Sequence, residues 1–139
     1  MALLELRISL ESEAVFLASE RRKQVHIDKM KAALDDFEKH ISSGENDGTV
    51  KADYDFHIAI AEASENQYFV DFLKYLGEKI IPRARVKSIE QSPVNREDYL
   101  KTVHHDHVNI FNAIVDQDGL LARQMMRAHL SKSIKKFKQ

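Results

Sequence analysis

Cysteine is absent from the 139-residue chain. Its absence excludes disulfide bonds, thiolate metal sites and cysteine nucleophiles, and it suits a reducing cytoplasm, where we expect the protein to reside. The chain also has only four glycines and two prolines. These residues interrupt regular structure, so the chain has few obvious breaks between its elements.

A strong excess of either charge is missing too. The formal net charge is −1 and the isoelectric point is near 6.7, which leaves no electrostatic footprint for nucleic acid over the chain as a whole. No apolar run approaches the roughly 20 residues needed to span a bilayer, and residues 1–14 carry charges too early for a signal peptide. The length corresponds to one domain, which we expect to occupy residues 1–139 without a membrane partner.

Apolar residues are plentiful and recur every three or four positions, the period of an amphipathic α-helix. Hydrophobic residues make up 43% of the chain and charged residues 31%, and no segment of useful length alternates as a β-strand does. The sequence therefore predicts an all-α fold, an antiparallel bundle of about six helices joined by short connections.

The predicted helices follow from these stripes. The first covers 2–22, and its buried side is expected to include Leu3, Leu6, Leu10, Ala14 and Leu17. The second places Ile27, Met30, Ala33 or Leu34, Phe37 and Ile41 inward and ends at the turn "SSGENDG". The third covers 49–64, and the fourth, with Phe69, Phe72, Leu73, Leu76 and Ile80 inward, is expected to kink or end near Pro82.

Capping residues mark the later helix starts. Asn66 is placed to cap the fourth helix, Asn95 with Asp98 resembles a capping box for the fifth, and Asp118 is placed to cap the last helix, from Gly119 to about 137. The stretch "IEQSPVN", residues 89–95, is expected to be a loop. The fifth helix should bury Val103, His107, Ile110, Phe111 and Ile114, and the last Ala122, Met125, Met126 and His129.

Four polar residues fall on these inner faces. Asp53 and His57 lie one turn apart on the third helix, while His107 and His129 lie in the inner stripes of the fifth and last helices. A buried carboxylate and several buried imidazoles are costly without partners. A divalent cation would satisfy all four, because one carboxylate oxygen and three imidazole nitrogens suit zinc best, and also nickel, cobalt, iron or manganese.

The alternative is that each of the four is a core side chain satisfied by its neighbours, which is common for a single histidine and for an Asp–His pair on one helix. The other histidines are weaker candidates: His26 and His40 are expected at exposed or boundary positions, and His104 and His105 are expected to be solvated beside the inner stripe. Three acidic residues near the site, Glu62, Glu65 and Asp106, are expected to point outward.

Arginines are the natural partners of an anionic ligand. Arg7 lies beside the predicted stripe of the first helix, although it could equally form a helical pair with Glu11, four residues on. Arg83 and Arg85 follow Pro82 and would more readily lie at a solvated helix end.

Three stretches, "LRISLESEAVFLA", "DYDFHIAIAEASEN" and "HVNIFNAIVDQDGLLARQMMRAHL", closely resemble the signature segments of the FadR C-terminal domain (FCD). This domain is the effector-binding half of one subfamily of GntR-type bacterial transcription regulators. The resemblance to its metal-binding branch implies that Asp53, His57, His107 and His129 hold a metal. It further implies that a small organic or sugar acid binds nearby with help from Arg7, and that the protein is a homodimer.

A complete regulator of this kind would also carry an N-terminal winged helix that binds DNA, and the sequence lacks one, so DNA binding is expected only through a parent protein. We expect a ligand sensor and not an enzyme. Two alternatives stay open: a metal-dependent hydrolase that uses a metal-activated water, and a structural or metal-free helical interaction domain.

Overall fold

The computed structural model describes residues 2–43, 46–77 and 93–138. Within these ranges the chain forms six helical segments and no strand. They are α1 (Ala2–Arg21), α2 (Gln24–Ile41), α3 (Asn46–Ala63), a helix over 67–77, α5 (Pro93–Val115) and α6 (Gly119–Lys138). The predicted all-α bundle is confirmed.

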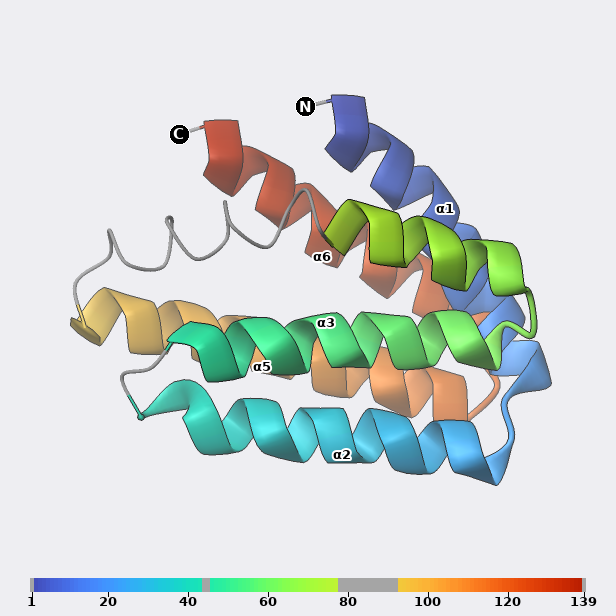
Figure 1. Ribbon diagram of the computed structural model, residues 1–139, viewed down its shortest axis with the longest axis horizontal. Coiled ribbons are helices and arrows are strands. Elements are labelled where there is room, and N and C mark those ends of the chain that lie inside the picture. Colours follow the sequence, from blue (N-terminus) through green and yellow to red (C-terminus); the bar gives the residue numbers. More distant parts are fainter. Residues whose placement is uncertain (1, 44–45, 78–92, 139) are drawn as a thin grey trace.

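The helices pack as an antiparallel bundle in which α2 runs along α3, and α1 runs along α6 (Figure 1). Helix α5 lies between these pairs and contacts α1, α2 and α6. One apolar cluster joins α1, α2, α3, α5 and α6, and its fully buried members include Val15, Met30, Phe56, Ile110 and Met126. No helix in the described ranges is both long and apolar enough to cross a membrane.

The inner face predicted for α1 is wrong in phase at the start of the helix, although Ala14 is buried as predicted. Leu3 and Leu6 are 41% and 48% exposed, whereas Leu4, Val15 and Ala18 are buried. Apolar residues occur on both sides of this helix, so the stripe starting at Leu3 competes with the one starting at Leu4. The stripe that packs against the bundle also contains a charged residue, Glu11, which is 2% exposed.

The predicted caps at Asn66 and Asp118 are confirmed. The Oδ1 atom of Asn66 accepts the backbone N–H of Tyr68 at 3.0 Å, and that of Asp118 accepts the N–H of Leu121 at 3.2 Å. The cap predicted at Asn95 is wrong, because α5 already begins at Pro93, a residue type favoured in the first turn of a helix. Residues 93–95 are therefore helical and not a loop.

Both turns that precede these caps reverse the chain through a left-handed residue. Glu65 after α3 and Gln117 after α5 have a φ of 58°. Beyond α5, the N–H of Asp118 donates to the carbonyl of Ala113 at 2.9 Å and the N–H of Gln117 to that of Ile114 at 3.0 Å. This pair of bonds closes the helix end without a glycine. The kink predicted at Pro82, together with Ile80, Arg83 and Arg85, lies outside the described residues.

Candidate metal centre

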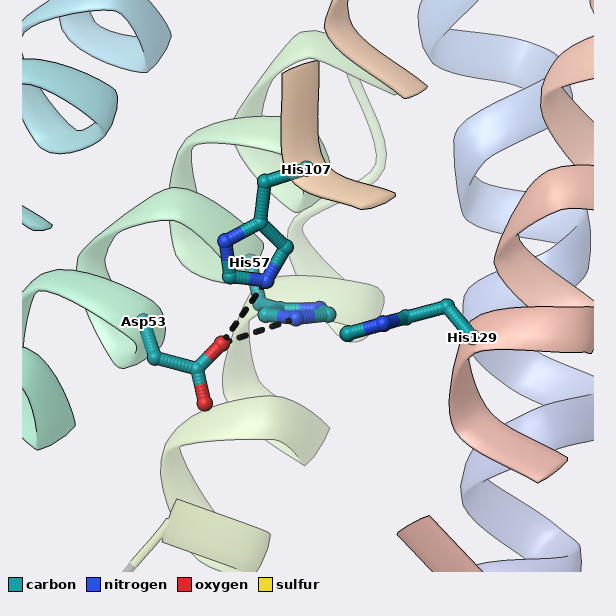
Figure 2. Close-up of side chains that lie close together, drawn as sticks. All are labelled: Asp53, His57, His107 and His129. Carbon is teal, nitrogen blue, oxygen red and sulfur yellow. Dashed lines mark ion pairs between the residues drawn. The ribbon is translucent and has the colours of Figure 1, made fainter. Parts of the chain in front are cut away.

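Three helices bring the four predicted ligands to one point. Asp53 and His57 lie one turn apart on α3, His107 projects from α5, and His129 projects from α6 toward the other three (Figure 2). One ligand atom from each residue can be chosen such that all four lie within 4.8 Å of one another. Within the described part of the chain, this is the group with the composition and spacing of a metal site.

The donor atoms face one another without forming hydrogen bonds. Oδ1 of Asp53 lies 3.2 Å from Nε2 of His57 and 3.1 Å from Nε2 of His107. Although these are ion-pair distances, all three atoms are buried and lack a hydrogen-bond partner among the described residues. Two ligand atoms at right angles, each about 2.1 Å from one ion, would lie about 3.0 Å apart. The observed spacing therefore fits donors arranged around a cation.

The site is closed on the histidine side and open at Asp53. His107 is fully buried and His57 is 3% exposed, whereas Asp53 exposes 41% of its side chain although its Oδ1 atom is buried. An ion held by these four donors would thus be covered by the core on one side, and it could be reached from the side of the aspartate.

Electrostatics divide the metal-free site into charged and neutral groups. Desolvation favours the neutral form of each group. At Asp53 the interactions of the carboxylate with the rings of His107 and His57 outweigh desolvation, and they hold the pKa of Asp53 well below its ordinary value. Desolvation is likewise outweighed at His57, where the carboxylates of Glu11 and Asp53 raise the pKa to about 9. At His107 desolvation prevails and lowers the pKa to about 4. Near neutral pH, His107 therefore already presents an unprotonated nitrogen.

Glu11 stands directly behind His57. Its Oε1 atom accepts a hydrogen bond from Nδ1 of His57, and its Oε2 atom accepts one from Nε of Arg7. Desolvation of this buried carboxyl is outweighed by Arg7 and His57, which lower the pKa of Glu11 to about 2. The anticipated Arg7–Glu11 pair exists, but it is part of the site and not an exposed helical pair, since Glu11 is 3% and Arg7 15% exposed.

Asp106 stands behind His129 in the same way. Its Oδ2 atom lies 3.0 Å from Nδ1 of His129, and Lys132 approaches both of its oxygens at 3.2 Å. This engagement leaves Nε2 of His129 for the centre. The prediction that Asp106 points outward is wrong, because its side chain is only 15% exposed. Carboxylates that hold the second ring nitrogen are typical of metal-binding histidines.

The other acidic candidates point away from the centre. Glu62 lies 3.5 Å from Lys29, and Glu65 lies 2.8 Å from Lys23, both as exposed pairs. The outward orientation predicted for them is confirmed.

Two predictions for the remaining histidines are wrong. His104 is 17% exposed, stacks on Phe37 with 5.9 Å between ring centroids and pairs with Glu38 at 3.1 Å. His26 is buried, and its Nδ1 atom accepts the backbone N–H of Lys23 at 3.0 Å, which caps the start of α2. The ring therefore has a structural role at a helix end.

The other two histidines match their predicted positions. His40 is half-buried near the end of α2, and His105 is exposed on α5. His105 therefore lies away from the centre although it is only two residues from His107.

Glu11 is the main residue that sequence reasoning missed. A carboxylate on a helix is ordinarily solvated, so Glu11 was considered only as a surface partner of Arg7. Its position along the helix could have indicated burial. Glu11 lies on the same helical face as Leu4, Val15 and Ala18, which are all buried.

The family model of the FCD domain matches residues 2–132. Similar curated proteins include the HTH-type transcriptional regulator LutR of Bacillus subtilis (strain 168), 29% identical over 93% of this chain and 58% of its own length. The Glc operon transcriptional activator and the Uxu operon transcriptional regulator of Escherichia coli (strain K12) are 27% and 28% identical, over 96% and 92% of this chain.

The chain spans about half the length of these relatives, namely 58%, 53% and 49%. Among solved structures, E. coli McbR/YncC superposes with a TM-score of 0.84 over 96% of this chain and 65% of its own, at 16% identity, which shows a shared fold. The match of the family model to nearly the whole chain is decisive: this protein belongs to the FCD domain family.

Proposed function

We propose that this chain is the ligand-sensing domain of a GntR/FadR-type transcription regulator. In this role it holds a divalent metal ion and a small organic or sugar acid in the core of its bundle. The observation that carries the proposal is the convergence of four ligand atoms within 4.8 Å, three of them buried without a hydrogen-bond partner in the described residues. Buried polar atoms of this kind are rare unless something binds them.

The ligand set favours a borderline metal. Asp53 supplies one anionic oxygen, and His57, His107 and His129 supply three nitrogens, which suits zinc best and also accommodates nickel, cobalt, iron or manganese. When bound, the ion supplies a positive charge that attracts an anionic ligand. The exposed side of Asp53 is the direction from which such a ligand could approach.

Arg7 is the residue we assign to the acid. Its Nε atom is engaged by Glu11, and its terminal nitrogens make no other hydrogen bond in the described residues. These nitrogens present two parallel N–H groups, a geometry that matches a carboxylate. Desolvation opposes the charge of Arg7, but Glu11 and, to a lesser extent, Asp53 outweigh it and raise the pKa of Arg7.

A hydrolase built on the same centre would need a general base near the metal that is not itself a ligand. The nearby carboxylates of Glu11 and Asp106 are both committed to histidine Nδ1 atoms. The relatives are named as transcriptional regulators and an operon activator. Both observations favour a sensor over an enzyme.

The parent protein that we envisage is a homodimer that binds DNA through an additional N-terminal domain. The additional DNA-binding domain is supported by the greater length of the relatives and by their names, whereas the homodimer is only implied by the resemblance to the family. To control DNA binding, the acid must bind more tightly to one arrangement of the dimer than to the other. Equal affinity for both arrangements would leave their equilibrium unchanged.

The test begins with metal content. Protein purified without chelator and without a histidine tag should bind one equivalent of zinc, and Asp53→Ala and His107→Ala should each lose it. The matched controls are Asp55→Ala and His105→Ala, which remove the same residue types at nearby solvent-accessible positions on the same helices. Full zinc stoichiometry in both Asp53→Ala and His107→Ala would refute the ligand assignment.

A thermal-shift screen then tests the acid. Mono- and dicarboxylates, including sugar acids, should raise the melting temperature in the presence of zinc and lose that effect with EDTA or in Arg7→Ala. If no acid shifts the wild-type melting temperature, the domain is not a sensor of this class, and a structural role for the metal replaces the proposal.

A further inference from the structure

The carboxylate of Glu11 contacts two residues, each through a different oxygen. Oε1 faces Nδ1 of His57 on α3, and Oε2 faces Nε of Arg7 on α1. The side chain is 3% exposed. It is therefore a buried bridge between a proposed metal ligand and the residue proposed to bind the acid.

Each contact constrains its partner. An ionised carboxylate only accepts hydrogen bonds, so Nδ1 of His57 must carry a proton, and Nε2 is left as the nitrogen that faces the centre. Through its contact with Nε, Glu11 also fixes the plane of the Arg7 guanidinium and leaves the terminal nitrogens available.

We propose that Glu11 is a positioning residue that couples the metal site to Arg7, so that occupancy of the metal site is transmitted to the arginine through one carboxylate. The inference rests on the proposed function, since it presupposes that His57 binds a metal. If metal at His57 alters the orientation of Arg7 through Glu11, then an anion at Arg7 alters metal affinity by the same factor, because coupling between two binding sites is reciprocal.

Helix α1, which carries Glu11, also offers an internal control. Glu13 of α1 pairs with Arg123 of α6 at 3.3 Å, with both side chains substantially exposed and neither touching the four ligands. It is a Glu–Arg pair on α1 without the connection to a histidine. Comparison of the two glutamates separates the bridging role from the general effect of losing an ion pair on this helix.

Zinc affinity, measured by competition with a chromophoric chelator, is the first readout. Glu11→Gln should weaken zinc binding by about 10–100-fold, as expected for loss of a carboxylate behind a metal-binding histidine. Glutamine offers one acceptor group and one donor group, so it can keep only one of the two contacts. Glu13→Gln should stay within about twofold of the wild type, since exposed pairs contribute little.

The second readout is the side-chain Nε–H signal of Arg7 in proton–nitrogen NMR spectra of the wild-type chain. Zinc should shift this signal more than that of Arg123, and in Glu11→Gln at saturating zinc the shift should fall to less than half. Because the wild-type measurement needs no variant, the absence of a zinc-dependent shift would overturn the coupling even if Glu11→Gln does not fold, which circular dichroism of the metal-free protein would reveal.

The outcomes distinguish the two proposals. If the wild type binds no zinc, the proposed metal site fails and the coupling fails with it. If the wild type binds zinc but Glu11→Gln retains its affinity, or if the Arg7 signal does not respond to zinc, the metal site stands and Glu11 is only a structural ion-pair partner.

Discussion

At the scale of single residues, the site is defined by which nitrogen of each histidine is engaged. Glu11 holds Nδ1 of His57, and Asp106 holds Nδ1 of His129, while neither ring nitrogen of His107 has a hydrogen-bond partner in the described residues. The two rings with a carboxylate behind them are oriented by it, and His107 is oriented by packing against Phe37 and Phe56.

Protonation of His57 would make the proposed metal binding dependent on pH. In the metal-free protein the pKa of His57 is about 9, because Glu11 and Asp53 outweigh desolvation. Its Nε2 proton must leave before a metal can bind, so zinc uptake at pH 7 should release about one proton from this residue. Apparent zinc affinity should consequently rise with pH and level off as pH approaches 9.

Calorimetry in two buffers of different ionisation enthalpy measures the number of protons released when zinc binds. The observed binding enthalpy at pH 7 should differ between the buffers in proportion to the proton released, and His105→Ala, which lies outside the site, should behave as the wild type. Identical enthalpies in both buffers would show that His57 is already neutral in the metal-free protein.

Among the sequence predictions, the convergence of the four candidate ligands could be predicted because their chemistry conflicts with their positions. A carboxylate and imidazoles in apolar stripes are conspicuous, and the 3.6-residue period places them reliably on α3, α5 and α6. Glu11 and Asp106 were missed because their orientation depends on which tertiary neighbours stand opposite them. The sequence of one helix does not predict whether a polar side chain faces solvent or a histidine from another helix.

At the scale of elements, two arginines at the end of α1 donate hydrogen bonds to the C-terminal ends of other helices. Arg21 donates to the carbonyl of Ser64 at 2.8 Å, just beyond α3, and Arg22 donates to the carbonyl of Val115 at 2.7 Å at the end of α5. Carbonyls in the last turn of a helix lack partners within the helix, and a cation there also complements the helix dipole. These contacts anchor the two helices that supply three of the four proposed ligands.

Arg22→Ala should lower the free energy of unfolding by about 1–3 kcal/mol, because buried carbonyls at the end of α5 lose a charged donor. Urea denaturation of the metal-free protein measures this loss. The matched control is Arg127→Ala on the exposed side of α6, which should change stability by no more than about 0.5 kcal/mol. Equal midpoints for the two variants would show that the Arg22 contacts contribute nothing net.

Element prediction succeeded where one stripe dominates and failed where two compete. In α2 a single face carries Met30, Leu34, Phe37 and Ile41, and all four are buried as predicted. In α1 leucines lie on both sides, and the choice between them depends on which side α6 and α3 cover. The fold class could thus be predicted from local pattern, whereas the phase of α1 could not.

At the scale of the whole molecule, the proposed ion would tie together helices that are distant in sequence. Its donors come from α3, α5 and α6, and Glu11 links α1 to the same point. A ligand that binds only the folded state stabilises it by mass action. The metal would therefore contribute to the stability of the bundle as well as to sensing.

Zinc should accordingly raise the melting temperature of the whole domain. At free zinc about 100-fold above the dissociation constant, the expected gain is about 2.7 kcal/mol, or roughly 5–10 °C for a chain of this size. Differential scanning calorimetry with zinc and with EDTA measures the shift, and His129→Ala should reduce it. An unchanged melting temperature in the wild type would show that zinc does not bind selectively to the native bundle.

The order of the four donors along the chain has a consequence for biosynthesis. Asp53, His57 and His107 leave the ribosome before His129, which belongs to α6, and proteins are made from the N-terminus onward. A nascent chain could therefore gather three donors early but complete the set only once α6 has emerged. High-affinity binding of the ion would then begin only when α6 packs onto the bundle.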